Sequence, residues 1–290
     1  MSVPVLSVAQ MREWEKATWA SGQTEAEVIR RVGEQVAMVA LKLAKPGDSI
    51  LILAGKGHNG DDARAAQNHL AGRQIELLEV KNPDQDFPEL EDSLSHRPAL
   101  VIDGLFGVGL NRPLDDHWKK IIQRINDSRL KVLSVDTPSG LSAETGEPQG
   151  AAIEASVTLT VGAPKTGLLR QQAWPFVGRL EVAANVGLVP GPLTSELNWT
   201  LPGDFSAFPP GRPVASHKGS FGHLAILAGS LGFHGAAVMA ARAAQRARPG
   251  LITLFTQENV YEPVASQLRA VMVHPWSPKV NLPGDFKALL

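Results

Sequence analysis

Short apolar runs that stop directly at a glycine or an aspartate restrict the fold of this chain more than any other feature. Three of them are SILILA (residues 49–54), ALVID (99–103) and KVLSVD (131–136), and helical segments lie between them. Such runs are typical of strands buried on both faces of a parallel sheet. Strands that alternate with helices predict an α/β fold, in which a mostly parallel sheet is covered by helices on both faces.

The other expected elements of this first domain have the same rhythm. Ser7 is a candidate N-cap for the first helix, and the apolar residues of the second recur at helical spacing until Pro46 and Gly47 end it. We expect helices over residues 7–19, 25–44, 62–70 and 117–125. We expect further strands over residues 74–80, 157–161 and 180–183.

A change of composition predicts how the chain is divided. Prolines and glycines crowd residues 189–215, which is typical of a linker or of a segment that wraps around a domain. Beyond it we expect a strand (223–228), a glycine-rich loop (229–235), a helix (236–247) and another strand (251–256). We therefore predict a domain over 1–190, a linker over 191–215, and a second α/β unit over 216–290 that is short for a doubly wound domain and hence incomplete.

The bulk composition excludes several classes of protein. The 290 residues contain no cysteine, so disulfides, zinc–thiolate sites and cysteine nucleophiles are ruled out. A formal net charge of −1 does not favour a nucleic-acid or membrane partner. Residues 1–12 lack a signal-peptide pattern, and no apolar run approaches the ~20 residues of a membrane span. We expect a cytoplasmic protein.

The loops after the strands are the candidate site, because ligands of parallel sheets bind at the carboxyl ends of the strands. The first loop, GKGHNGDD (55–62), has three glycines and leads into a helix N-terminus, where free N–H groups suit a phosphate. The alternative is a glycine-rich turn with Asp61 or Asp62 as N-cap. His58 lies in this loop and is a candidate ligand contact.

The second and third loops each begin with a carboxylate at the end of a buried strand. Asp103 starts DGLFGVGLNR (103–112), whose glycines bring backbone amides near a ligand and whose Arg112 can bind a phosphate. Asp136 starts DTPSG (136–140), with the Ser139 hydroxyl three residues on. The alternative for the second loop is that Asp103 only caps its own loop, and the alternative for the third is that DTPSG is a capped helix start. Two carboxylates and an asparagine at one sheet edge favour a cation bound by oxygen atoms and a general acid–base.

These three loops, in this order, resemble those of the NAD(P)H-hydrate epimerase family, whose motifs are GxxNNGGDG, DxLFGTGL and VDxPSG. The chain has GKGHNGDDA (55–63), DGLFGVGL (103–110) and VDTPSG (135–140) in their places, and the resemblance extends over about residues 5–190. The second unit resembles the start of the ADP-dependent NAD(P)H-hydrate dehydratase, a ribokinase-like fold, in HKGSFG (217–222), AGS (228–230), GAA (235–237) and GLIT (250–253).

The resemblance implies a three-layer, Rossmann-like first domain that interconverts the R and S hydrates of NADH and NADPH. It implies that Asn59, Asp103 and Ser139 bind a potassium ion and that Asp136 lies against the hydrated ring as the acid–base residue. It places the substrate on a larger set of residues, namely His58, Asn59, Gly60, Asp61, Asp62, Gly107, Val108, Gly109, Leu110, Asn111, Arg112, Pro113 and Asp136, with Ala236 in the second unit. ADP or ATP is the expected cosubstrate of the dehydratase half, and the family favours a homo-oligomer.

The chain departs from the family pattern mainly in the first loop. His58, Asp61 and Ala63 replace Asn, Gly and Gly, and the Asp61 charge should weaken binding of a nearby anion by ~1 kcal/mol or more. Val108 replaces the usual Thr of the second loop, and Arg248–Pro249 replace Gly–Ala. These departures leave open a catalytically impaired binding or scaffold protein. The dehydratase family has its catalytic aspartate in a late GTGD segment, which these 290 residues lack, so we expect this half to be inactive in this chain, as a fragment or a degenerate unit.

Overall fold

The computed structural model describes residues 2–189, 195–209, 211–277 and 288–289. The chain forms two compact units, Met1–Asp204 and Phe205–Leu290, and each is described here by itself. The domain boundary predicted after residue 190 falls outside the described residues. Across the part of the chain that the structure describes, no helix is long and apolar enough to cross a membrane.

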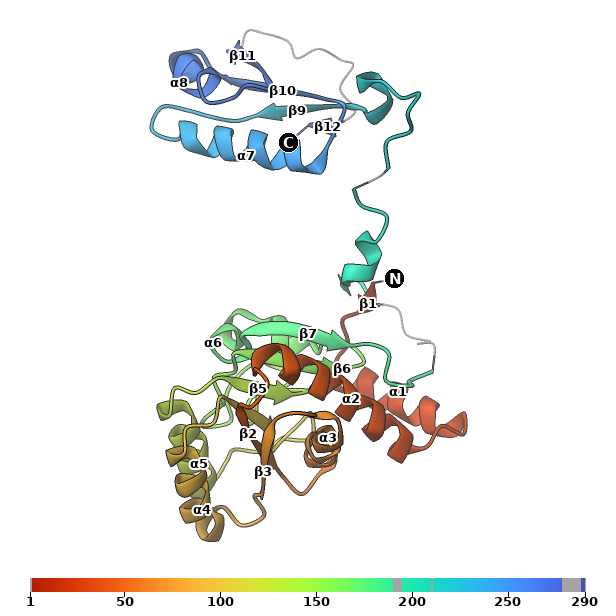
Figure 1. The fold of residues 1–290 in the computed structure, drawn as a ribbon, viewed down its shortest axis with the longest axis vertical. Coiled ribbons are helices and arrows are strands. Elements are labelled where there is room, and N and C mark those ends of the chain that lie inside the picture. Colours follow the sequence, from red (N-terminus) through yellow and green to blue (C-terminus); the bar gives the residue numbers. More distant parts are fainter. Residues whose placement is uncertain (1, 190–194, 210, 278–287, 290) are drawn as a thin grey trace. The chain divides into compact units, whose positions relative to one another are not determined.

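A six-stranded parallel sheet forms the centre of the first unit (Figure 1), in the order β3-β2-β4-β5-β6-β7. The strands are β2 (Ser49–Ala54), β3 (Gln74–Glu79), β4 (Leu100–Gly104), β5 (Val132–Val135), β6 (Val157–Val161) and β7 (Arg179–Ala183). The predicted α/β fold with its parallel sheet is confirmed, and each predicted strand occurs within one or two residues of its expected bounds. The order reverses between β2 and β4, and sheets of this kind bind their ligands beside such a reversal.

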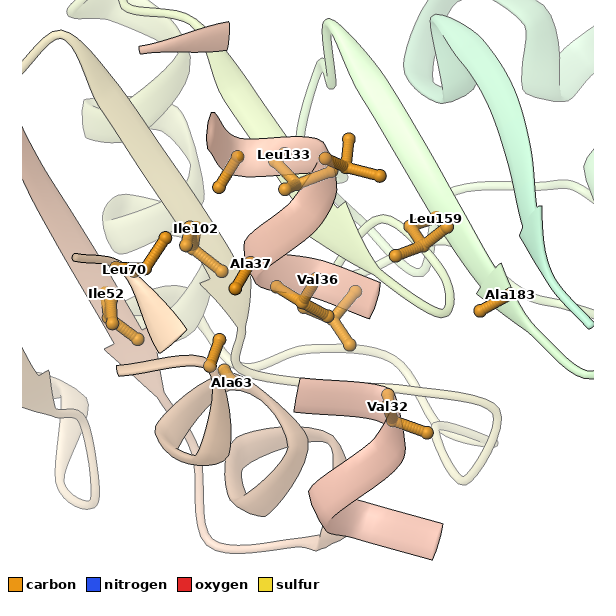
Figure 2. Close-up of a cluster of buried hydrophobic side chains, with 14 of the residues drawn as sticks. Val32, Val36, Ala37, Ile52, Ala63, Leu70, Ile102, Leu133, Leu159 and Ala183 are labelled. Atoms are coloured by element: carbon orange, nitrogen blue, oxygen red, sulfur yellow. The ribbon is translucent and has the colours of Figure 1, made fainter. Parts of the chain in front are cut away.

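Helices cover both faces of this sheet. They are α1 (Val8–Ala20), α2 (Glu25–Leu43), α3 (His58–Ala66), α4 (Pro83–Ser95), α5 (Asp116–Asp127) and the short α6 (Trp174–Val177). Alternate strand residues point to opposite faces. Ile50 and Ile52 therefore pack with α2 and α3, whereas Leu51 and Leu53 pack with α4 and α5. Figure 2 shows the hydrophobic core between the sheet and helices α2 and α3, in which Val32 and Val36 of α2 lie over the sheet. The three predicted layers are present.

Two expectations about helices were wrong in detail. The helix expected over 62–70 begins four residues earlier, at His58, and α3 ends at Ala66, where a 3₁₀ turn over Gln67–His69 begins. Its N-cap is Gly57, without a side-chain bond, so neither Asp61 nor Asp62 caps it. Helix α4, which contains Pro88, was not predicted. By contrast, Ser7 caps α1 as expected, with its side chain accepting from Gln10 N at 3.1 Å.

Part of the proline-rich segment belongs to the first unit. Strand β8 (Asn198–Trp199) pairs antiparallel with β1 (Val3–Pro4), and Val5 N donates to Leu197 O at 2.9 Å. Residues 190–194 and 210 of the predicted linker are outside the described residues. Residues 197–199 thus contact the start of the chain.

The second unit has its own parallel sheet, in the order β11-β10-β9-β12. Its elements are β9 (His223–Leu227), α7 (His234–Ala247), β10 (Leu251–Gln257), α8 (Tyr261–Ala265), β11 (Met272–Trp276) and β12 (Ala288–Leu289). Helix α7 buries Ala237, Val238 and Ala241 against Ile226 and Leu254 of the sheet. The predicted second α/β unit is confirmed, and α7 begins two residues earlier than expected.

Candidate functional site

The site lies where the strand order of the first unit reverses. The loop after β2 and the loop after β4 meet there so closely that a Cβ on Gly55 would come within 2.2 Å of Leu105 O. Gly107 is close enough to Asn59 that a Cβ on it would lie 3.3 Å from the Asn59 side chain. This close approach explains why glycines stand at these two positions.

A cavity of about 450 Å³ opens beside these loops. Its walls come from the first turn of α3, the loop after β4, the end of β5, the end of β6 and one face of α1. Its polar and charged lining side chains are those of Glu15, Lys56, His58, Asn59, Asp62, Asn111, Arg112, Asp136 and Lys165. The cavity therefore combines free N–H groups of a helix N-terminus with cations at its mouth and an acidic interior.

Asp136 and Lys165 form the most buried ion pair among the described residues. The side chains are 10% and 1% exposed, and the Lys165 ammonium donates to Asp136 Oδ1. Lys165 Nζ also donates to Thr160 Oγ1 at 3.0 Å and to Val161 O at 2.9 Å, so all three of its protons have acceptors. Val161 N donates to the same Asp136 Oδ1 at 3.1 Å. Asp136 Oδ2 takes part in none of the hydrogen bonds that the described residues form, and Asp136 lines the cavity.

The backbone of Asp136 is also unusual. Its φ is +63°, in the left-handed region that non-glycine residues seldom adopt. Strain of this kind persists only where the surroundings enforce it, and Asp136 N is held by Leu159 O at 2.8 Å. The turn thereby presents the carboxylate to the cavity, and no helix starts at this turn, contrary to one of the alternatives read from the sequence.

Two further carboxyl groups share the cavity with this pair. Burial raises the pKa of Glu15, and the nearby Asp136 charge raises it further. Burial also raises the pKa of Asp62 well above its ordinary value, and the charges of Asp136, Asp61 and Glu15 add to the effect. Like charges held together around one ammonium favour protonation of some of them, which is a property of acid–base sites.

Asp103 lies behind the cavity and is completely buried. Its carboxylate accepts from Ser139 N at 2.9 Å, Ser134 Oγ at 2.8 Å and Leu105 N at 3.3 Å, and the Ser139 hydroxyl donates to it as well. Burial raises its pKa, and these hydrogen bonds oppose that rise. All four donors are neutral. Asp103 thus ties the loop after β4 to the loop after β5, without a cationic side chain among its described partners.

The buried oxygens around Asp103 suit a large monovalent cation. Asn59 Oδ1 is buried, and within the described residues it has no hydrogen-bond partner, although Asn59 Nδ2 donates to Phe106 O at 2.9 Å. An orphaned buried oxygen is costly unless something positive contacts it. Ser139 Oγ accepts from Phe106 N at 2.8 Å and links the same loop. The donor set is all oxygen, and the described residues contain no cluster of three histidine or acidic side chains of the kind that binds transition metals.

Asp61 is not part of the cavity wall. Its carboxylate is paired with Arg64 Nη1 at 2.6 Å, and Arg64 also donates to Gly55 O at 2.6 Å and to Glu79 at 3.1 Å. The Arg64 guanidinium therefore compensates the Asp61 charge. The expectation that Asp61 repels a bound anion did not take this ion pair into account. His58 lies at the cavity mouth, with Nε2 3.3 Å from Glu25 Oε1.

The structure brings together most of the residues predicted to bind substrate. The residues that line the cavity are His58, Asn59, Asp62, Gly107, Val108, Gly109, Leu110, Asn111, Arg112 and Asp136. Gly60, Asp61 and Pro113 are adjacent to it in the chain but are not part of its wall, and Ala236 lies on α7 in the other unit. Asp103 and Ser139 are completely buried and are not part of the wall, but Ser139 and Asn59 both form hydrogen bonds with the Phe106 backbone.

Lys165 and Glu15 were missed as site residues. Lys165 lies four residues beyond the end of β6, so the strand-end argument that selected Asp103 and Asp136 could have selected it too. Glu15 is one of several charged residues on α1, and no local signal distinguishes it from a solvated one.

Comparison with known proteins separates the chain into the same two parts. Residues 25–90 and 77–167 match the family "YjeF-related protein N-terminus", and residues 224–286 match the family "NAD(P)H-hydrate dehydratase". The chain is 33% identical to a "bifunctional NAD(P)H-hydrate repair enzyme Nnr" of Hyperthermus butylicus, over 98% of the chain and 54% of that protein. It is 32% identical to the protein of the same name from Coxiella burnetii, over 97% and 61%. A "NAD(P)H-hydrate epimerase" of Limosilactobacillus fermentum is 29% identical, over 64% of this chain and 99% of its own length. The chain thus spans little more than half the length of the bifunctional relatives.

Proposed function

Because the chain belongs to the family of bifunctional NAD(P)H-hydrate repair enzymes, we propose that its first unit epimerises the R and S hydrates of NADH and NADPH. The observation that carries the proposal is the buried Asp136–Lys165 pair, which lines the cavity beside a helix N-terminus. The repair sequence would then continue with ADP- or ATP-dependent dehydration of the S hydrate, the reaction that the resemblance of the second unit implies.

The chemistry asks for a group that both gives and takes a proton. Epimerisation at the hydroxyl-bearing ring carbon requires that the C–O bond break as the hydroxyl is protonated and leaves as water. The ring-nitrogen lone pair stabilises the cation, and water then adds to the opposite face and loses a proton. Asp136 Oδ2, held toward the cavity while Lys165 occupies Oδ1, is placed to exchange that proton. Lys165 is a positioning residue for this carboxylate.

The phosphates of the dinucleotide would be held by the other wall. The first turn of α3 offers unpaired N–H groups, and its N-cap Gly57 has no side chain to occupy them. Lys56 and Arg112 add positive charge at the same cavity. In this arrangement His58, Asn59 and residues 107–112 contact the substrate, as the family resemblance implies.

A potassium ion fits the oxygens of Asn59, Asp103 and Ser139. The orphaned Asn59 Oδ1 and the buried Asp103 carboxylate, whose described partners are all neutral, support this assignment. When bound, the ion would supply a positive charge that stabilises the loops and nearby anionic oxygens. The assignment to potassium and the homo-oligomeric state favoured by the family stay predictions.

The proposal is tested by assaying the purified chain with the R hydrate of NADPH and monitoring the appearance of the S hydrate by chromatography. We expect exchange well above the uncatalysed rate, and we expect potassium to raise it more than sodium does. The variant Lys165→Met should lose most of the activity. The variant Lys120→Met, which removes an exposed lysine on α5, is the matched control.

A binding or scaffold role without turnover is the second candidate function. Val108, which lines the cavity without the hydroxyl of the family motif, favours it. Thermal stabilisation of the chain by the dinucleotide, together with no detectable exchange of hydrates, would establish this second role. If the dinucleotide gives no thermal stabilisation and the chain gives no exchange of hydrates, both candidate functions are excluded.

A further inference from the structure

An open, positively charged cavity lies in the second unit, at the edge of its sheet where the strands begin. Strands β9, β10 and β11 are parallel and in register there, with Leu251 beside His223 and Thr253 beside Met272. The segments that lead into these strands contribute Lys218, Arg248 and Arg269 to the cavity wall. The cavity volume is about 650 Å³, within the range of small-molecule sites.

This edge is opposite to the one where α/β folds of this kind bind their substrates. The glycine-rich loop after β9 and the start of α7, which carry the resemblance to the dehydratase, lie at the carboxyl ends of the strands. Arg248 instead lies just after the end of α7, at the amino ends of the strands. The basic cavity is therefore separate from the expected dehydratase site.

The charges of the cavity are not balanced locally. Among the described residues, no acidic side chain lines it, and no ion pair is formed by Lys218, Arg248 or Arg269. A fourth cation, Arg212, has a structural role: it donates to Arg248 O at 2.9 Å and lies over the Phe221 ring, 4.6 Å from its centroid. The three side chains are exposed, so water screens the repulsion between them, and a bound anion would balance their charge.

Backbone strain marks the same place. Arg248 has φ +56° and ψ +45°, the left-handed conformation that favours glycine. Two residues on, a Cβ at Gly250 would come within 1.6 Å of Lys218 O, which shows how tightly the segment before β9 packs on this turn. An arginine at a helix C-cap gains some energy from the helix dipole. That gain does not explain why Lys218 and Arg269 line the same cavity, because these two residues belong to other segments of the chain.

From the cavity, its three uncompensated cations and the strained Arg248, we infer that the second unit has a separate binding site for a small phosphate-bearing ligand of nucleotide size. Arg248 is the residue that gives it specificity, since its guanidinium can bind phosphate oxygens in pairs. The inference does not depend on the proposed epimerase activity, because no residue of the first unit takes part.

The test is calorimetric titration of the full chain with inorganic pyrophosphate and, separately, ADP at low salt. We expect binding that weakens as salt is added, and a loss of about tenfold or more in affinity for Arg248→Gly. Glycine suits the left-handed conformation, so this variant should melt at the same temperature as the parent or higher. Arg246→Gln, on the last turn of α7 and outside the cavity wall, is the matched control and should bind as the parent does.

Two further variants locate the binding site and separate charge from geometry. Lys56→Gln removes a cation from the cavity of the first unit, where pyrophosphate can also bind, and it should leave unchanged the part of the binding that Arg248→Gly removes. Arg248→Lys keeps a charge and should retain part of the affinity. The inference is overturned if Arg248→Gly binds as well as the parent, if Arg246→Gln loses affinity equally, or if Lys56→Gln abolishes binding. Tighter binding of a short RNA than of ADP would point instead to a nucleic-acid surface and would also overturn it.

Discussion

Asp103 and Asp136 stand at the ends of neighbouring strands, yet the structure gives them opposite surroundings. Asp103 is wholly buried, accepts four hydrogen bonds from neutral donors and lies behind the cavity wall. Asp136 accepts from a buried ammonium, has one oxygen without a described partner and lines the cavity. A strand-end carboxylate alone therefore does not specify a chemical role.

The difference comes from the course of the backbone after each strand. After β5, the chain turns through a left-handed Asp136, which rotates its carboxylate toward Lys165 and the cavity. After β4, the backbone at Asp103 has no such turn, and the carboxylate stays beneath the loops, where Ser134 and Ser139 reach it. One aspartate can exchange a proton with a ligand, while the other holds two loops and a candidate cation site.

Replacing Asp136 is the change that should affect catalysis most. Asn in Asp136→Asn tolerates the left-handed backbone and keeps an acceptor for Lys165, but it cannot exchange a proton. We expect the rate of hydrate exchange to fall about 10²- to 10⁴-fold. The assay is the chromatographic conversion of the R hydrate, with the melting temperature measured in parallel. An unchanged rate would show that Asp136 is not the acid–base residue.

Replacing Asp103 should instead affect stability most. Asp103→Ala leaves buried N–H and hydroxyl donors without acceptors, and we expect a loss of about 3 kcal/mol in the free energy of unfolding. Ser134→Ala removes only one of these hydrogen bonds and should cost about 1 kcal/mol. Urea denaturation measures both. A loss in Asp103→Ala no larger than in Ser134→Ala would mean that the carboxylate does not hold the loops together.

Much of the fold and part of the site could be predicted from the sequence, and the failures have physical causes. The buried strands and the loops after them were predictable, because apolar runs and glycines are local signals. The ion pair of Asp136 with Lys165 was not, since it joins residues 29 positions apart through a backbone conformation that no local pattern indicates. Likewise, the ion pair of Asp61 with Arg64 could be predicted only if α3 were known to begin at His58, because this start places the two residues one helical turn apart.

The acidic neighbours of Asp136 should make stability depend on pH. The pKa of Asp62 is raised in the folded chain, mainly by burial and then by Asp136, Asp61 and Glu15, while Lys165 opposes the rise. Between its ordinary value and the raised value the folded state binds more protons, so stability falls as pH rises through this range. Asp62→Asn removes the penalty and should flatten the dependence by up to about 1.4 kcal/mol per pH unit.

The measurement is the free energy of unfolding in urea at several pH values from mildly acidic to neutral. The variant should be more stable than the parent at neutral pH and similar to it at acidic pH. Asp92→Asn changes an exposed carboxylate on α4 that forms no ion pair with the described residues, and it serves as the control for a general charge effect. A parent chain that becomes steadily more stable up to neutral pH, with or without Asp62, would show that this carboxyl is not held in a raised-pKa environment.

The smallest expected effect concerns Asp61, a residue at which the first loop departs from the family motif. Because its carboxylate is bound to Arg64 and is absent from the cavity wall, Asp61→Asn should change the KM for the hydrate by less than about fivefold, corresponding to about 1 kcal/mol. Arg64→Gln should have the larger effect, since it frees the Asp61 charge and also breaks the hydrogen bond to Gly55 O that holds the loop after β2. Steady-state kinetics on both variants decides between the two. If Asp61→Asn lowers KM tenfold or more while Arg64→Gln changes nothing, the Asp61 charge acts directly on the substrate. The distinction between carboxylates that line the cavity and carboxylates that only hold the loops would then fail at Asp61.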